Sequence, residues 1–337
     1  MIVTKNVQRQ TRYTLSPEAR CEALARAGGV EFGEVGEGKV MQSMLFDDNV
    51  RKTAHYLVFH DESEPIPNKG WLLIGLLFVK EEHLCNIEGT LNYHRRQENY
   101  DGEIHFCKLP KSFDGEFGAK ARVARRWMRD YQDGMCQGAL FTCLAVNRAS
   151  PKFERERFKE DFHAYNRFTA MAIKAGVSYL LQPLGYDVIE LTVVSDGKDR
   201  KSRPMQGIVD NFEDYLHYRV ELDNIMAQLT TERHYPTVKM QQIRVISSEQ
   251  NNLLQLTDLL LGSLQVAMFG ISNRPVKREL ARMVSSWYQD LQRPPTKQQY
   301  KMHRKFNVWG FPDDQGKPFH HFSMAVYPNG AEQLLLF

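Results

Sequence analysis

Apolar runs of strand length recur between residues 55 and 270, separated by longer segments of helical pattern, and together they predict an α/β fold. The predicted strands are 55–63, 71–80, 103–109, 139–148, 187–196 and 238–247. The predicted helices are 81–100, 118–133, 151–182, 207–230 and 251–270. Because strands cluster first and later alternate with helices, we expect a mixed sheet flanked by helices, in which the strands 55–61 and 187–196 are parallel neighbours.

These elements divide the chain into three parts. Residues 1–54 are predicted to form an N-terminal arm, with a short helix that begins after Ser16. Residues 55–270 form the α/β domain, and residues 271–337 form a C-terminal extension with a helix near its start. The pattern leaves open whether the arm or the extension binds a protein partner or a second copy of the chain.

Composition and charge are those of an ordinary globular protein. The chain has 337 residues, of which 42% are hydrophobic and 25% are charged, and these values exclude a disordered or fibrous protein. A net charge of +3 is too small to indicate nucleic-acid binding by itself, although local basic groups still allow it.

The cysteines and the apolar run lengths bear on the location of the protein. Five scattered cysteines without a CxxC pair argue against a zinc knuckle and favour reduced thiols. The N-terminus lacks an apolar signal core, and the longest apolar run, 71–79, is far too short to span a bilayer. We therefore expect a cytoplasmic protein without a membrane partner.

Two acidic residues, Asp61 and Asp196, stand where strongly apolar strands end. In open α/β sheets ligands bind at the carboxyl ends of the strands, so two parallel neighbours would bring these carboxylates together. A hard cation such as Mg²⁺ relieves the repulsion between carboxylates that share a site. The alternative is that each acid is a turn residue, because acids commonly follow strands.

The apolar segment 251–270 carries a narrow polar stripe. Its members are Asn251, Gln255, Asp258, Gly262 and Gln265, at spacings of three and four residues. The stripe is either a thin solvent-facing seam or the lining of an internal polar site with Asp258 as a ligand. The weaker candidate Glu103 follows the turn signal Asp101-Gly102, so it can also be an ordinary first residue of a strand.

A family resemblance rests on five segments taken in order. They are HYLVFHDES (55–63), WLLIGLLFV (71–79), EIHFCKL (103–109), IELTVVSD (189–196) and SSEQNNLLQLTDLLLGSL (247–264). Together they resemble the large bacterial family numbered 3800 among the domains of unknown function, with its Asp-Glu-Ser strand end and its Gln-Leu-x-Asp helix. That family is similar to ribonuclease-H-like nucleases and integrases, so the resemblance implies a ribonuclease-H-like mixed sheet over residues 55–270.

Carried over position by position, the resemblance implies a catalytic and metal-binding set. The set is Asp61, Glu103, Asp196 and Asp258, with Glu116 or Glu88 as alternatives to Glu103. Such a site would hold Mg²⁺ or Mn²⁺, which prefer carboxylate oxygens, for phosphodiester hydrolysis. In this hypothesis Asp61 bridges two ions, Asp196 and Asp258 each help to hold one, and Glu103 holds the second ion or orients the attacking water.

Basic residues supply candidate contacts to a nucleic-acid backbone. The candidate substrate-binding residues Lys198, Arg200, Lys201 and Arg203 follow Asp196 directly. A second basic group is Arg122, Arg125, Arg126 and Arg129. Each group can equally be a solvated surface.

Three functions stay open at this point. The first is a metal-dependent nuclease acting on RNA or DNA, in a defence or mobile-element setting that only the resemblance implies. The second is a non-cutting nucleic-acid-binding or assembly module of the same fold. The third is an integrase-like strand-transfer enzyme.

Several other residues are assigned no catalytic role. His60 and His105 are expected to pack or to form structural hydrogen bonds. Ser63 and Ser195 have no matched base at an informative spacing, so a serine hydrolase is not expected.

Overall fold

The computed structural model describes residues 51–63, 70–134, 136, 138–158, 160–196, 210–230, 235–292 and 305–327. The short helix predicted after Ser16, and nearly all of the predicted arm, lie outside these ranges.

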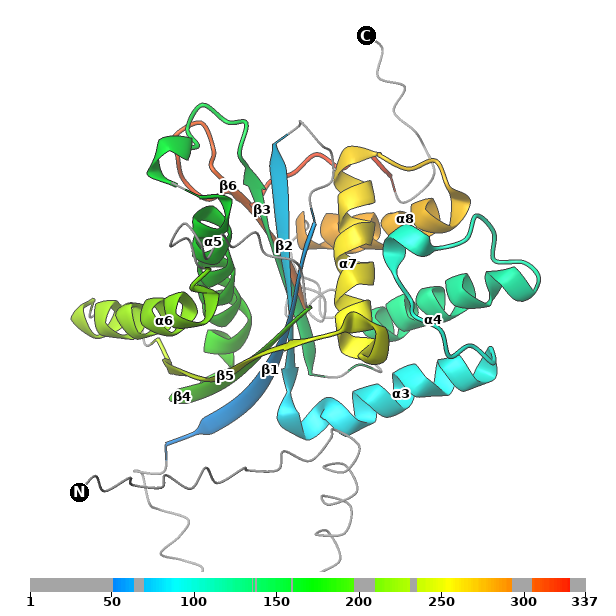
Figure 1. Ribbon diagram of the computed structural model, residues 1–337, viewed down its shortest axis with the longest axis horizontal. Helices are drawn as coiled ribbons and strands as arrows, with labels where there is room; N and C mark the ends of the chain where they lie inside the picture. The colour runs from blue at the N-terminus through cyan, green and yellow to red at the C-terminus, as the bar shows by residue number, and fades with distance from the viewer. Residues whose placement is uncertain are drawn as a thin grey trace, which may run out of the picture. The chain divides into compact units, whose positions relative to one another are not determined.

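A six-stranded sheet with the order β5-β4-β1-β2-β3-β6 forms the centre of the described structure (Figure 1). Its strands are β1 (Thr53–Ser63), β2 (Trp71–Lys80), β3 (Ala139–Asn147), β4 (Val188–Asp196), β5 (Thr237–Ile246) and β6 (Phe306–Phe311). β1 pairs antiparallel with β2 and β2 with β3, whereas β1 and β4, β4 and β5, and β3 and β6 pair in parallel. The predicted α/β fold class, a mixed sheet flanked by helices, is confirmed, and so is the parallel pairing of β1 with β4.

Helices cover both faces of the sheet (Figure 1). They are α3 (Leu84–Gln97), α4 (Ala119–Asp133), α5 (Asp161–Gly176), α6 (Phe212–Leu229), α7 (Asn252–Phe269) and α8 (Pro275–Gln292). The first core contains buried residues of α3, α4, α7 and α8 together with Phe59 and Leu73 of the sheet. The second contains buried residues of α5 and α6 together with Val58 and Ile74. This alternation along each strand places the odd-numbered residues of β1 on the α7 face.

The segment 103–109 is not a strand, so its prediction as the third strand was wrong. It contains a short 3₁₀ helix, Phe106–Lys108. The backbone amides of Ile104 and Phe106 donate to side chains of α7, Gln255 Oε1 at 2.9 Å and Asp258 Oδ2 at 2.6 Å. Because these side chains satisfy the amides, the segment needs no strand partner.

Two described elements after position 270 join the structure around the sheet. α8 packs against α7, and β6 pairs in parallel with β3. The division of the chain at positions 54 and 270 stays a prediction.

The membrane and cysteine expectations can be compared with the described residues. No helix among them is both long and apolar enough to cross a bilayer. Among the described cysteines, Cys107, Cys136 and Cys143 are free thiols.

Gly262 lies where the 106–108 turn approaches α7 most closely. A Cβ at this position would lie 2.3 Å from the nearest ring carbon of Phe106, which is much closer than the 3.5–4.0 Å of normal carbon contacts. Because Gly262 has no side chain, the 106–108 turn and the neighbouring His105 can pack beside Asp258.

Replacing Gly262 by alanine should force Phe106 to move and destabilise the protein. We expect a net loss of up to about 2 kcal/mol, because an overpacking cost of about 1–3 kcal/mol outweighs the ~1 kcal/mol that alanine gains in helix propensity. The control is Gly89→Ala in α3, where the new Cβ has no neighbour within 4 Å, so stability should stay equal or rise. Denaturant unfolding of both variants measures the difference, and equal effects would contradict the packing argument.

Candidate functional site at the carboxyl ends of β1 and β4

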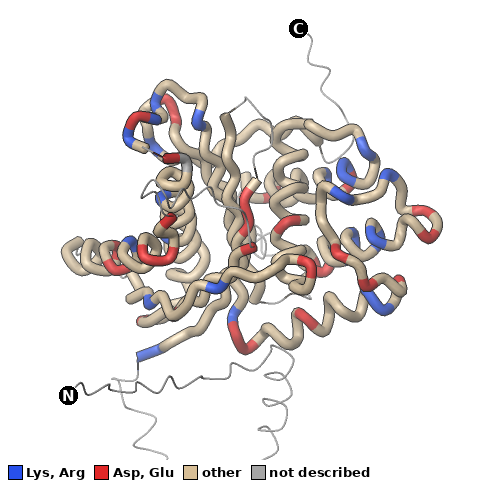
Figure 2. Tube along the Cα trace, viewed as in Figure 1, with Lys and Arg blue, Asp and Glu red and all other residues tan. Residues whose placement is uncertain are grey.

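A cavity of about 360 Å³ lies where the ends of β1 and β4 meet α7 and the 103–108 segment. The four predicted acidic residues, Asp61, Glu103, Asp196 and Asp258, all line it. Acidic positions on β1 and on α7 lie near each other at the centre of the molecule in Figure 2. The structure therefore brings together the four carboxylates that the sequence placed far apart along the chain.

Asp61 and Asp196 reach the cavity through the register of β1 and β4. His60 pairs with Ser195, so the next residue on each parallel strand is an aspartate at the same edge of the sheet. One oxygen of Asp61, Oδ1, accepts the backbone amide of Glu62 at 2.9 Å. Asp196 Oδ1 accepts the amide of Ser248 at 3.0 Å. These amide donors fix the orientation of both carboxylates.

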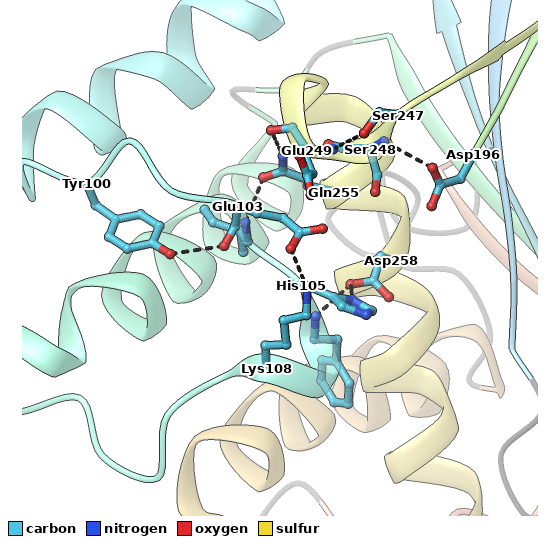
Figure 3. A network of polar contacts seen from close by, with 12 residues as sticks. Tyr100, Glu103, His105, Lys108, Asp196, Ser247, Ser248, Glu249, Gln255 and Asp258 are labelled. Atoms are coloured by element: carbon cyan, nitrogen blue, oxygen red, sulfur yellow. Dashed lines mark hydrogen bonds and ion pairs between the residues drawn. The ribbon is translucent and has the colours of Figure 1, made fainter. Parts of the chain in front are cut away.

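Asp258 projects from α7 toward the 103–108 segment (Figure 3). Its Oδ2 accepts the amide of Phe106 at 2.6 Å and the ring Nδ1 of His105 at 2.8 Å. The hydrogen bond to Asp258 is the largest cause that raises the pKa of His105 above its ordinary value, against the opposing effect of burial. The polar stripe of α7 thus faces the cavity at Asp258.

Glu103 lies across the cavity and forms an ion pair (Figure 3). Its Oε2 accepts from Lys108 Nζ at 2.8 Å. This hydrogen bond is the main reason that the pKa of Glu103 lies below its ordinary value. The Lys108 side chain is 62% exposed, whereas that of Glu103 is 20% exposed, so the lysine stands at the solvent side of the pair.

Lys108 is a site residue that sequence reasoning missed, whereas His105, expected only to pack or to form a structural hydrogen bond, also lies at the site. Both line the cavity and contact one of the predicted acids. The available signal for His105 was its position two residues after Glu103, which in an extended chain puts both side chains on one side.

The predicted basic groups have different outcomes. Lys198, Arg200, Lys201 and Arg203 lie outside the described residues. In α4, Arg122 and Arg126 form ion pairs with Glu98, and Arg125 and Arg129 lie within 3.4 Å and 4.0 Å of Glu279. The α4 group therefore faces acidic partners of the chain itself.

His60 and Ser195 meet on the opposite face of the sheet. The His60 ring lies 2.9 Å from Ser195 Oγ and packs beside Tyr165 and Phe212. Ser195 thus has a histidine neighbour that sequence spacing did not reveal. Both residues are almost completely buried, His60 at 0% and Ser195 at 1% exposure, and neither lines the carboxylate cavity.

The donor chemistry of the cavity fits a hard divalent cation. Its four carboxylates are the ligand type that Mg²⁺ and Mn²⁺ prefer. Within the described ranges, however, no three acidic, histidine or cysteine side chains stand close enough together to form a metal-binding group. Mg²⁺ commonly uses one or two carboxylates and completes its shell with water and substrate phosphate, and the cavity has room for both.

Comparison with solved structures finds remote similarities. The ribonuclease H2 from Pyrococcus horikoshii OT3 is 12% identical, with a TM-score of 0.31, and the match covers 74% of this chain and 97% of that one. Bst-RNase HIII in complex with Mn²⁺ is 9% identical, with a TM-score of 0.29, and the match covers 85% of this chain and 76% of that one. No protein-family model and no curated protein matches the chain. At this level of similarity neither ribonuclease's activity transfers to this chain.

The His105–Asp258 contact predicts a measurable pH dependence. Since folding raises the pKa of His105, the stability from this contact is fully present below the ordinary pKa of 6.5 and is lost as pH rises through the raised value. An NMR titration of metal-free protein should place the His105 midpoint above 6.5, and Asp258→Asn should lower it. A midpoint at or below the ordinary value in the parent protein would contradict the contact.

Proposed function

We propose that this chain is a metal-dependent nuclease that hydrolyses phosphodiester bonds of RNA or DNA. The observation that carries the proposal is the convergence of four carboxylates, from β1, the 103–108 segment, β4 and α7, on one cavity. Carboxylates that line one cavity at the carboxyl ends of parallel strands support this proposal, because Mg²⁺ needs only one or two of them when water and substrate phosphate complete its shell.

The proposed roles of the acids are those that the family resemblance implies. Asp61, Asp196 and Asp258 would hold the divalent ions, and Glu103 would hold a second ion or orient the attacking water. Bound Mg²⁺ or Mn²⁺ supplies an activated water and offsets charge on the attacking and leaving oxygens.

The chain's own donors restrict how the carboxylates can turn. The amides of Glu62, Ser248 and Phe106 each hold one oxygen of an aspartate. A side chain held in this way loses less conformational entropy when it binds an ion or a substrate. Lys108, exposed beside Glu103, is positioned to contact a phosphate at the rim of the cavity.

Nucleic acid is the proposed partner, and the basic segment that follows β4 in the sequence is its proposed contact region. Lys198, Arg200, Lys201 and Arg203 follow Asp196 in the sequence, so they stay proposed contacts to the phosphate backbone.

A second candidate is a non-cutting nucleic-acid-binding module of the same fold. The Glu103–Lys108 and Asp258–His105 contacts favour it, because each gives a carboxylate of the cavity a lysine or histidine partner within the protein. An integrase-like strand-transfer enzyme would use the same residues and would be recognised by a joined product.

The nuclease proposal predicts cleavage that depends on the metal and on the cavity acids. Labelled single- and double-stranded RNA and DNA should be cut with Mg²⁺ or Mn²⁺ and stay intact with a chelator. Asp61→Asn, Asp196→Asn and Asp258→Asn should each lower the rate on the order of 10²-fold or more, because each removes charge at the reacting phosphate. Gel analysis of the products measures all of these rates.

A matched control separates site effects from general loss of charge. Asp314→Asn changes an exposed acid that does not line the cavity, so cleavage should proceed at the parent rate. Binding that survives the chelator, with no cleavage of any substrate, would reject the nuclease and support the binding module.

A further inference from the structure

Arg95 of α3 is a buried cation close to, but outside, the carboxylate cavity. It is only 7% exposed, and its guanidinium lies 5.0 Å from the centre of the Trp127 ring. Burying a charge is costly unless its donors are satisfied. The groups that satisfy Arg95 therefore indicate what the residue does in the fold.

The hydrogen bonds of Arg95 join three segments of the chain. Nε donates to Asn252 Oδ1 at 2.8 Å, and one terminal nitrogen donates to the carbonyl of Gly102 at 2.7 Å. The other terminal nitrogen donates to Gln255 Oε1 at 2.5 Å. The planar, fork-shaped guanidinium thus links α3 to the start of α7 and to the turn that precedes Glu103.

Gln255 forms hydrogen bonds with chain segments on two sides of the cavity (Figure 3). Its Oε1 accepts the amide of Ile104, next to Glu103, at 2.9 Å. Its Nε2 donates to the carbonyls of Ser248 at 2.7 Å and Glu249 at 3.0 Å. Ser248 in turn donates its amide to Asp196. One fully used amide side chain, 2% exposed, therefore connects the segment of Glu103 with the residue that holds Asp196.

We propose that Arg95 and Gln255 are positioning residues that set the distance between the Glu103 side and the Asp196 side of the carboxylate cavity. Asp258 lies three residues after Gln255 on the same helix face, so the pair places both sides relative to Asp258. The metal-affinity part of this inference rests on the proposed function, whereas the local-order part does not.

The pair predicts local changes in hydrogen exchange. Arg95→Met in the full chain should speed exchange of the Ile104 amide by about tenfold or more, because its acceptor Gln255 loses a charged partner. Mass spectrometry of peptides covering 102–106 and 247–251 should show faster exchange in both segments. Arg96→Met is the matched control, since Arg96 is the exposed neighbour on α3, and it should leave both peptides unchanged.

A second variant separates the hydrogen bonds of Gln255 Oε1 from those of its Nε2. Gln255→Glu keeps the oxygen that accepts from Arg95 and Ile104 but loses the two donors to Ser248 and Glu249. Exchange should therefore rise in 247–251 while 102–106 stays protected. An equal rise of hydrogen exchange in both segments would overturn the assignment of separate roles to Oε1 and Nε2 of Gln255.

Mn²⁺ alone is the probe for positioning. If the full chain binds Mn²⁺, Arg95→Met should lower the affinity measured by calorimetry on the order of 10- to 100-fold, the usual cost of losing a group that orients metal ligands, whereas Arg96→Met should match the parent. Unchanged Mn²⁺ affinity despite local loosening would overturn the positioning role and leave the proposed nuclease standing.

Two further outcomes distinguish failure of the positioning role of Arg95 and Gln255 from failure of the proposed nuclease function. Faster exchange throughout the described helices and strands of Arg95→Met would mean that Arg95 only stabilises the fold, and would overturn the proposal. Absence of Mn²⁺ binding by the parent chain would count against the proposed function, while the local exchange pattern would still support Arg95 and Gln255 as the link between the two sides.

Discussion

The need to supply hydrogen-bond donors to four carboxylates that line one cavity is the constraint that the rest of this structure has to meet. Each carboxylate has a donor from the chain: a backbone amide for Asp61 and for Asp196, a lysine for Glu103, and an amide together with a histidine ring for Asp258. Hydrogen bonds to carboxylates are among the stronger contacts in proteins. The local structure around the cavity places these donors beside the carboxylates.

The sheet and α7 bring the acids and their donors to one place. Parallel pairing of β1 with β4 puts Asp61 and Asp196 at one edge, and α7 packs across β1 and β2 on the same face. Gly262 then lets the 106–108 turn approach α7, so that the Phe106 amide reaches Asp258. The hydrogen bonds of Arg95 and Gln255 add a buried connection between the segment of Glu103 and Ser248, the residue whose amide holds Asp196.

Local pattern was sufficient to predict the strands and the last helix of the site. β1, β2, β4 and α7 lie within one or two residues of their predicted bounds, since each is a long run with a clear period. Asp61, Asp196 and Asp258 could be proposed because they interrupt such runs at strand ends or on a helix stripe. Their meeting in one cavity depended on topology, which for the β1–β4 pair followed from the handedness of crossover connections.

The remaining errors arose where long-range contacts override local pattern. The 103–109 segment alternates like a strand, but side chains of α7 take its backbone donors. The helix predicted from residue 151 begins only at Asp161, because Phe153 and Phe158 fold back to pack on Phe168. His105 could not be distinguished from a structural histidine, since its partner Asp258 lies far away in the sequence.

Anomalous diffraction from crystals of the protein grown with Mn²⁺ tests the central claim most directly. The account predicts a manganese peak inside the cavity, in contact with one or two of the carboxylates of Asp61, Asp196 and Asp258 and with water. A cavity without a peak, with Asp258 still bonded to His105 and Glu103 to Lys108 at saturating Mn²⁺, would contradict it.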